Sequence, residues 1–333
     1  MKSRSTARLM IWLFLALAPD VLASTTWYVD WQAGNDEYNC MSPETPCKTI
    51  FHAIELASSG DSILVAAGRY PSDLSIDFDL TIIGSTRHPG TFIIGSGVGA
   101  AVITIPNANT VVTLSNLTIT NGQGQYGGGI NTSGILTIND STVSGNVASP
   151  MGRWKAGGLG GGIFINGGTV EINNSTIVGN KAEAGGGIFN FGTLTVSNST
   201  IARNTATGGA GGGIYQGEPT VLENTIVADN SMGKNCSGVI SSNGYNLSSD
   251  ESCNFNGPGD LNNTDPQLGA LRYNGGPTQT MALPAGSPAV NAGNPSGCTD
   301  GEGHLLSTDQ RGKRRPDKKS GRCDIGAYEL KSN

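Results

Sequence analysis

The chain has 333 residues, of which 50 are glycine and only 14% are charged. Glycine is a poor helix former, so this composition disfavours long helices and predicts a β-rich fold. The formal net charge is −6. A negatively charged surface repels phosphate backbones, so we expect no nucleic-acid partner.

The N-terminal segment has the three-part pattern of a secretory signal peptide. A basic stretch, an apolar run of about ten residues over 9–18 and the small-residue sequence VLA at 21–23 follow one another. A membrane-spanning helix needs about 20 apolar residues, so the run is too short for an anchor. We predict a signal peptide over 1–23, cleaved after Ala23. The mature chain would be secreted or periplasmic, with no transmembrane segment.

Residues 24–60 are predicted to cap the front of the structure that follows. Five apolar residues recur there at helical spacing: Ile50, Phe51, Ala53, Ile54 and Ala57. This pattern predicts one amphipathic helix over 48–58, laid over the first coil. His52 and Glu55 fall on its polar side, and we expect no special role for them.

The residue pattern over 62 to 250 predicts a stack of short strands. Apolar and polar residues alternate, as in SILVAAG and LTIIG, which is the pattern of strands with one buried face. The motif GGGI occurs four times, with its isoleucine at Ile130, Ile163, Ile188 and Ile214. A second motif keeps the same register and ends at Asn146, Asn180, Asn204 and Asn230. A repeat of about 25 residues is one coil of a solenoid, and this stretch allows about seven or eight coils.

The repeated glycines and asparagines suit the corners of such coils. Glycine turns with positive φ or packs its backbone on the coil below, because it has no Cβ. Asparagine tolerates the left-handed conformation, and identical amides stacked coil on coil can form hydrogen-bonded ladders. We predict a structural ladder, with a ligand-binding role for these asparagines as the alternative.

Three stretches carry a resemblance to known families. SGN or VGN followed by GGGI resembles the repeats of polymorphic outer-membrane-type proteins, and WYVDWQAGNDEYNC is similar to the start of many pectate-lyase-like β-helices. DPQLGALRYNGGPTQTMALPAGSPAVNAGN, TDQRGKRRP and CDIGAYEL resemble the choice-of-anchor Q domain of secreted bacterial β-helix proteins. These resemblances imply an all-β fold, with a right-handed parallel β-helix over 61–255 and a choice-of-anchor Q-like region over 256–333.

The six cysteines lie in three sequence-local couples: Cys40 and Cys47, Cys236 and Cys253, Cys298 and Cys323. An even number in an oxidising compartment predicts disulfides; six cysteines allow 15 connectivities, of which we favour local pairing. Zinc is the disfavoured alternative, because the chain has no C-x-x-C pair and only three histidines. Residues 260–333 are rich in proline, glycine and asparagine and predict irregular structure packed on the far end.

One repeat carries an insertion that predicts a loop leaving the wall. Thirteen residues separate Asn146 from Gly160, where the next two units have four and six. The insertion holds Arg153, Trp154 and Lys155. An exposed indole beside cations suits stacking on a sugar ring or gripping an anion, so these three are the candidate ligand-binding residues. The alternative is that Trp154 folds back onto the neighbouring coil.

An acidic segment, SDLSIDFDLTI, is the candidate metal site. If it is a strand, its apolar residues face inward and Asp73, Asp77 and Asp79 lie on one outer face. Several carboxylates on one surface can hold calcium, the one cofactor that we consider. The alternative is a solvated acidic face.

A basic island near the C-terminus has two interpretations. It comprises Arg311, Lys313, Arg314, Arg315, Lys318, Lys319 and Arg322. It could bind phosphates or an acidic glycan, or Asp309, Arg311 and Arg315 could have a structural role.

The sequence gives no acid–base pair on the middle coils and no nucleophile motif around its histidines. We therefore expect a monomeric, secreted or surface-associated protein that binds polysaccharide or a cell-surface glycan. The alternative is a calcium-dependent polysaccharide lyase, or another carbohydrate-active enzyme of the pectate-lyase-like fold. Only four residues follow GAYE, and we expect release to the periplasm or medium, or non-covalent attachment to the cell surface.

Overall fold

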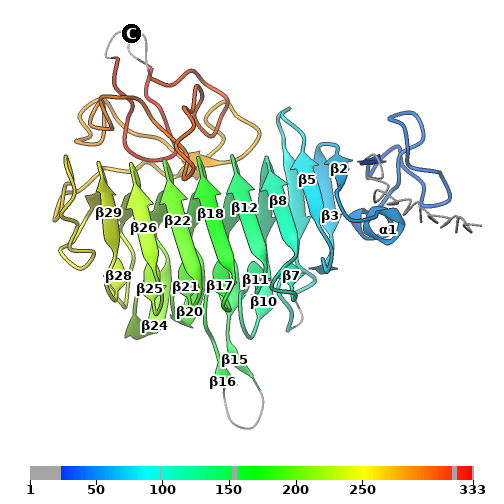
Figure 1. Cartoon of the computed structure of the whole chain (residues 1–333), viewed down its shortest axis with the longest axis horizontal. Helices are drawn as coiled ribbons and strands as arrows, with labels where there is room; N and C mark the ends of the chain where they lie inside the picture. Colours follow the sequence, from blue (N-terminus) through cyan, green and yellow to red (C-terminus); the bar gives the residue numbers. More distant parts are fainter. Residues whose placement is uncertain (1–23, 98, 152–155, 317–320, 332–333) are drawn as a thin grey trace, which may run out of the picture.

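The computed structural model describes residues 24–97, 99–151, 156–316 and 321–331. The chain winds into a right-handed parallel β-helix whose axis follows the long dimension of the molecule (Figure 1). Right-handed crossovers are the rule between parallel strands. The predicted fold class, an all-β parallel β-helix, is confirmed by the strand order.

Strands from successive coils stack into four parallel sheets. Sheet A contains, in spatial order, β1 (Thr26–Val29), β2 (Asp61–Val65), β5 (Leu80–Gly84), β8 (Val111–Ser115), β12 (Ile135–Asn139), β18 (Thr169–Asn173), β22 (Thr193–Ser197), β26 (Thr220–Glu223) and β29 (Ser241–Gly244). Sheet B contains β3 (Gly68–Pro71), β6 (Thr91–Ile94), β9 (Leu117–Thr120), β13 (Thr142–Ser144), β19 (Thr176–Val178), β23 (Thr200–Ala202), β27 (Ile226–Ala228) and β30 (Leu247–Ser248).

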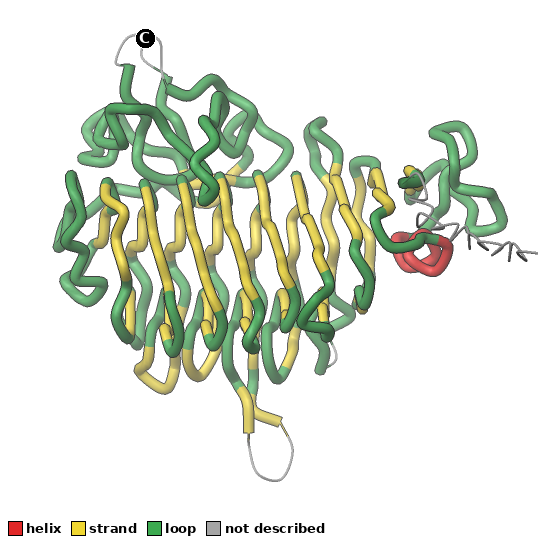
Figure 2. Tube along the Cα trace, viewed as in Figure 1, coloured by secondary structure: helices red, strands yellow, loops and turns green. Residues whose placement is uncertain are grey.

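The two remaining parallel sheets are shorter. Sheet C contains β4 (Leu74–Ser75), β7 (Ile103–Ile105), β11 (Ile130–Thr132), β17 (Ile163–Ile165), β21 (Ile188–Asn190), β25 (Ile214–Gln216) and β28 (Cys236–Ser237). Sheet D contains β10 (Gln123–Gly124), β14 (Val147–Ala148), β20 (Lys181–Ala184) and β24 (Thr205–Ala210). Two antiparallel pairs lie outside the coils: β15 (Pro150–Met151) with β16 (Ala156–Gly157), and β31 (Leu271–Arg272) with β32 (Thr280–Met281). Figure 2 shows the strands of successive coils lying side by side, across the long axis of the solenoid.

Each coil contributes aliphatic side chains from three sheets to one continuous core. In a central coil, Ile130, Ile138 and Val143 are fully buried, and in-register residues of the neighbouring coils repeat the pattern. Burying an aliphatic side chain contributes about 1.5–3 kcal/mol relative to leaving it exposed, so the stacked core is the main source of stability.

The two repeated motifs pack on each other, which explains their common register. The Asn180 Nδ2 donates a hydrogen bond to Asn204 Oδ1 at 3.0 Å. The same hydrogen bond joins Asn146 to Asn180 and Asn204 to Asn230. A Cβ added to Gly187 would lie 2.6 Å from the Gly213 carbonyl oxygen and 3.0 Å from Asn204 Nδ2. The asparagine ladder is therefore confirmed as structural, and the last glycine of GGGI makes room for it.

The left-handed residues are not the ladder asparagines themselves. The corner after sheet A holds Asn174, Asn198 and Asn224 at φ near +50°. Each ladder asparagine instead follows a left-handed residue, such as Gly145 before Asn146. Both corners use residues that tolerate positive φ at modest cost.

The N-terminal helix is confirmed, with shorter bounds than 48–58. Helix α1 (Ile50–Leu56) begins after Thr49, whose side chain accepts a hydrogen bond from the His52 amide. Ile50, Ala53 and Ile54 are buried against the first coil, but Phe51 is 54% exposed, so its expected inward position was wrong. Strand β1 pairs with β2, so the β-helix already begins inside the segment predicted as a cap.

The C-terminal region does not lie on the far end, as expected, but runs back along the side of the coils (Figure 1). It covers the outer face of sheet B, where Val178, Ala202 and Ala228 point outward and are buried by the second apolar cluster that includes Leu268 and Ile325. From β13 to β27 the outward residues of sheet B are threonine, serine or apolar residues, and all of them are buried. The far end is instead closed by the segment after β30, where Phe255 is buried in the main core.

Buried ion pairs hold the C-terminal region in place. Arg315 bonds to Glu329 Oε2 at 3.1 Å and to Asn174 Oδ1, on a β-helix corner, at 3.0 Å. Arg311 is paired with Asp309 and lies over the ring of Tyr328. The structural interpretation of these basic-island residues is confirmed. Lys318 and Lys319 lie outside the described residues.

The cysteines pair locally, as predicted: Cys40–Cys47, Cys236–Cys253 and Cys298–Cys323. Among the residues that the structure describes, no helical segment has both the length and the apolar character needed to cross a bilayer.

Candidate functional site

The predicted ligand loop leaves the wall as a hairpin. Strands β15 and β16 form an antiparallel ribbon that projects from the coils (Figure 1). Arg153, Trp154 and Lys155 lie outside the described residues, so their role stays a prediction.

The acidic segment turns a corner instead of forming one strand. Leu74–Ser75 are paired as β4 in sheet C, the chain turns over residues 76–79, and β5 in sheet A begins at Leu80. Leu74, Ile76 and Leu80 are buried, as expected.

The turn gives the three carboxylates different surroundings. Asp73 accepts hydrogen bonds from the Ser96 amide and hydroxyl, and Asp79 accepts one from the Val111 amide at 2.8 Å. Asp77 is exposed. The structure does not gather these three side chains into a metal-binding group, and calcium stays a prediction.

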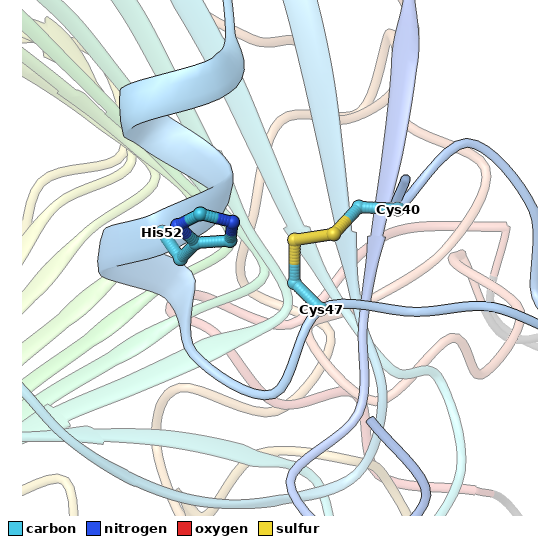
Figure 3. Close-up of side chains that lie close together, drawn as sticks. All are labelled: Cys40, Cys47 and His52. Carbon is cyan, nitrogen blue, oxygen red and sulfur yellow. A yellow bond between two sulfur atoms is a disulfide. The ribbon is translucent and has the colours of Figure 1, made fainter. Parts of the chain in front are cut away.

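One group of three potential metal ligands occurs within the described ranges. It consists of Cys40, Cys47 and His52, shown in Figure 3. Both sulfurs are committed to a disulfide, so neither is a thiolate that could bind a metal. The His52 Nδ1 lies 3.4 Å from Glu55 Oε2 on the same helix.

A row of aromatic rings follows the outer face of sheet C. Its register aligns Phe164 of β17 with Phe189 of β21 and Tyr215 of β25. The Phe189 and Tyr215 rings are stacked, with centroids 4.4 Å apart, and the Phe164 and Phe189 centroids are 5.6 Å apart. Each ring follows an inward isoleucine of GGGI, so strand alternation turns it outward. We call these three residues the aromatic row.

A hollow of about 390 Å³ opens at one end of the aromatic row. Its lining consists of Tyr126, Asn131, Leu159, Phe164, Asn166 and Phe191. We call it the aromatic hollow. Phe191 is 44% exposed and packs edge-on against Phe189 at 4.7 Å. Leu159 comes two residues after β16, so the hairpin leaves the wall at the border of the hollow.

Two free amides complete the aromatic hollow. Asn131 stands next to Phe164 in the register of sheet C, and Asn166 follows β17. Within the described ranges, neither side-chain amide has a hydrogen-bond partner, so each can donate to and accept from a ligand. The hollow thus combines apolar ring faces with uncommitted amides, the mixture typical of small-molecule sites.

The carboxyls with the most strongly raised pKa values lie elsewhere, under the C-terminal region. The pKa of Asp140 is raised to about 7, mainly by burial and in part by the nearby Asp309 carboxylate, while Asn174 and Arg315 act to lower it. Burial and then Glu329 raise the pKa of Asp324 to about 7. Such shifts often mark active sites, but here both groups are buried where the C-terminal region packs on the wall.

The stacked parallel sheets define a parallel β-helix protein, and the aromatic hollow lies on the surface of sheet C. The chain belongs to the family described as a protein of unknown function, DUF1565, whose model matches residues 32–256. No curated protein matches the chain significantly.

Solved structures of similar shape include pectin methylesterase PemA from Erwinia chrysanthemi, with 17% identity, a TM-score of 0.46, and coverage of 71% of this chain and 81% of that one. Pectate lyase Pel9A is another, with 14% identity, a TM-score of 0.41, and coverage of 92% of this chain and 97% of that one. At these values the likeness supports no conclusion about activity.

The aromatic row was missed from the sequence, although a signal for it was present. GGGIFI, GGGIFN and GGGIY place an aromatic residue directly after the buried isoleucine in three successive units. An aromatic residue recurring at an outward position indicates a surface row. The hollow could not be predicted, because Phe191 reaches it from the turn after β21 and Tyr126 from the loop before β11.

Proposed function

We propose that the protein binds a polysaccharide or cell-surface glycan along sheet C, with the aromatic hollow as the main contact. The observation that carries this proposal is the exposed ring of Phe191 beside the free amides of Asn131 and Asn166. The face of a sugar ring is apolar and packs on aromatic rings, while its hydroxyls need donors and acceptors such as amides.

The regular build of sheet C suits an extended ligand. Neighbouring parallel strands lie about 4.8 Å apart, so the outer row offers a new side chain at each coil. Thr104 and Asn131 continue the row beyond Phe164. A chain of sugar units lying along the axis would meet polar side chains first and then the aromatic row.

A location outside the cytoplasm supports this proposal. Three disulfides are typical of an oxidising compartment. The signal-peptide pattern over 1–23, which lies outside the described residues, points the same way. We propose a secreted or periplasmic protein, acting as a monomer.

The alternative is a calcium-dependent polysaccharide lyase or a related carbohydrate-active enzyme. Such an enzyme needs a base beside the bound sugar. The described lining of the aromatic hollow contains no carboxylate, histidine, lysine or arginine. Binding is therefore the better supported function of this site.

A glycan screen separates the two functions. The mature protein is incubated with immobilised neutral and acidic polysaccharides, with and without EDTA, while absorbance in the ultraviolet reports new unsaturated sugar ends. We expect retention on at least one polysaccharide without new absorbance. Absorbance that grows with time and disappears with EDTA would establish the lyase instead, and no retention on any polysaccharide would refute the binding proposal.

A further inference from the structure

A second hollow, of about 410 Å³, lies between the first coils and the C-terminal region. Its lining includes the side chains of Arg69, Phe92, Tyr273 and Gln279, together with Pro89 and two glycines. Arg69 of β3 and Phe92 of β6 are neighbours in the register of sheet B. Tyr273 and Gln279 lie at the two ends of the loop that joins β31 to β32. We call this hollow the arginine crevice; it forms only when the two parts of the chain are packed together.

Arg69 gives the arginine crevice an uncompensated positive charge. Its guanidinium carbon lies 5.1 Å from the centre of the Phe92 ring. Among the described residues, no carboxylate approaches the Arg69 side chain within 4.0 Å, and the lining of the crevice contains no acidic residue. In a chain with a net charge of −6, this guanidinium keeps its planar set of donors available for a ligand.

Two neutral donors lie in the same crevice. The side-chain amide of Gln279 and the hydroxyl of Tyr273 have no hydrogen-bond partner within the described ranges. The Tyr273 ring packs against His88 in a T-shaped arrangement, with centroids 4.3 Å apart. Burial raises the pKa of Tyr273 and the Arg69 charge lowers it, so the two groups lie close enough to interact.

We infer that the arginine crevice binds an oxyanion, meaning a carboxylate, sulfate or phosphate group. The guanidinium of Arg69 would pair with two oxygens, and Tyr273 and Gln279 would donate to the others. The anion is either a free inorganic ion or an acidic substituent on a sugar, whose ring would pack on Phe92. This site belongs to sheet B and the C-terminal region, so it is distinct from the aromatic hollow on sheet C.

The probes are sodium sulfate, sodium phosphate and sodium glucuronate, with glucose as the uncharged comparison, titrated by calorimetry at constant ionic strength. We expect at least one anion to bind saturably and glucose to bind far more weakly. Saturable binding of sulfate or phosphate identifies a general oxyanion site. Binding of glucuronate alone identifies an acidic-sugar site. Either outcome supports the inference, whereas no saturable anion binding, or equal binding of glucose, overturns it.

Variants locate the binding. Arg69→Gln should weaken anion binding at least tenfold, because hydrogen bonds to a charged group are the stronger ones. Arg272→Gln is the matched control: Arg272 is exposed, close in sequence to Tyr273 and not part of the lining, so its loss should leave the affinity within about twofold.

Tyr273→Phe removes one hydroxyl, and should weaken binding even if Arg69→Gln fails to fold. Unchanged affinity in both folded variants would overturn the inference. Glycan retention through Phe191 is read out separately, so failure here leaves the proposed function standing.

Discussion

Asp140 occupies a position that its counterparts in later coils fill with an uncharged residue. It has φ +50°, and the corresponding corner residues are Asn174, Asn198 and Asn224, at φ between +47° and +51°. Its Oδ1 is buried without a hydrogen-bond partner in the described structure, and burial raises its pKa to about 7. A carboxylate here is costly when ionised, because it is desolvated and only partly satisfied.

The pH dependence of stability follows from this raised pKa. The folded state holds the Asp140 proton up to about pH 7, whereas the unfolded chain releases it near pH 4. The contribution of Asp140 to the free energy of unfolding is therefore most favourable below about pH 4. This contribution falls as the pH rises to about 7. Asp324 acts in the same direction.

We predict that Asp140→Asn raises the free energy of unfolding at pH 8 by a few kcal/mol and makes it less dependent on pH between 4 and 7. Denaturant unfolding at several pH values measures this. Asn198→Asp is the reverse control, because it places a carboxylate at the same corner of a later coil. It should lower the free energy of unfolding at pH 8. If the free energy of unfolding of Asp140→Asn depended on pH as strongly as that of the parent protein, ionisation of Asp140 would cost little and this prediction would be wrong.

At the scale of the repeated element, GGGI and the asparagine ladder are one structural unit. Gly187 has no room for a Cβ, because the Gly213 carbonyl oxygen would lie 2.6 Å away. We predict that Gly187→Ala lowers the free energy of unfolding by about 1–3 kcal/mol through overpacking. Gly286→Ala is the control, since nothing lies closer than 4.0 Å to its added Cβ. Equal effects of the two substitutions in thermal melts would contradict this account.

The repeated elements were predictable because they depend on local patterns. Alternation identified the strands, and the shared period of GGGI and the asparagines identified the coils. Phe51 shows the limit of such reasoning: it fits the apolar helical pattern, yet α1 is only two turns long and its buried face is filled by Ile50, Ala53 and Ile54. The acidic segment fails similarly, because its alternation continues through the corner at residues 76–79.

At the scale of the whole molecule, the placement of the C-terminal region was not predictable from local patterns. Its docking depends on contacts far apart in sequence, such as Arg315 with Asn174 and Arg203 with the Leu268 carbonyl. One signal was available: Val178 and Ala202 are outward apolar residues on sheet B, which indicates a covered face. The C-terminal region covers sheet B, whereas the aromatic row lies on sheet C, on another side of the solenoid.

The central claim is that the aromatic hollow binds a sugar chain, and the exposed ring of Phe191 tests it most directly. The affinity of Phe191→Ala for the polysaccharide selected by the glycan screen is measured by calorimetry beside the parent protein. Phe51→Ala, which removes another exposed ring, that of α1, is the control. A stacked aromatic contact contributes about 1 kcal/mol, so we predict binding about five- to tenfold weaker in Phe191→Ala, with at most a small drop in melting temperature, and parental affinity in the control. Parental affinity in Phe191→Ala together with a lower melting temperature would show that the ring only packs on the wall, and would contradict the account.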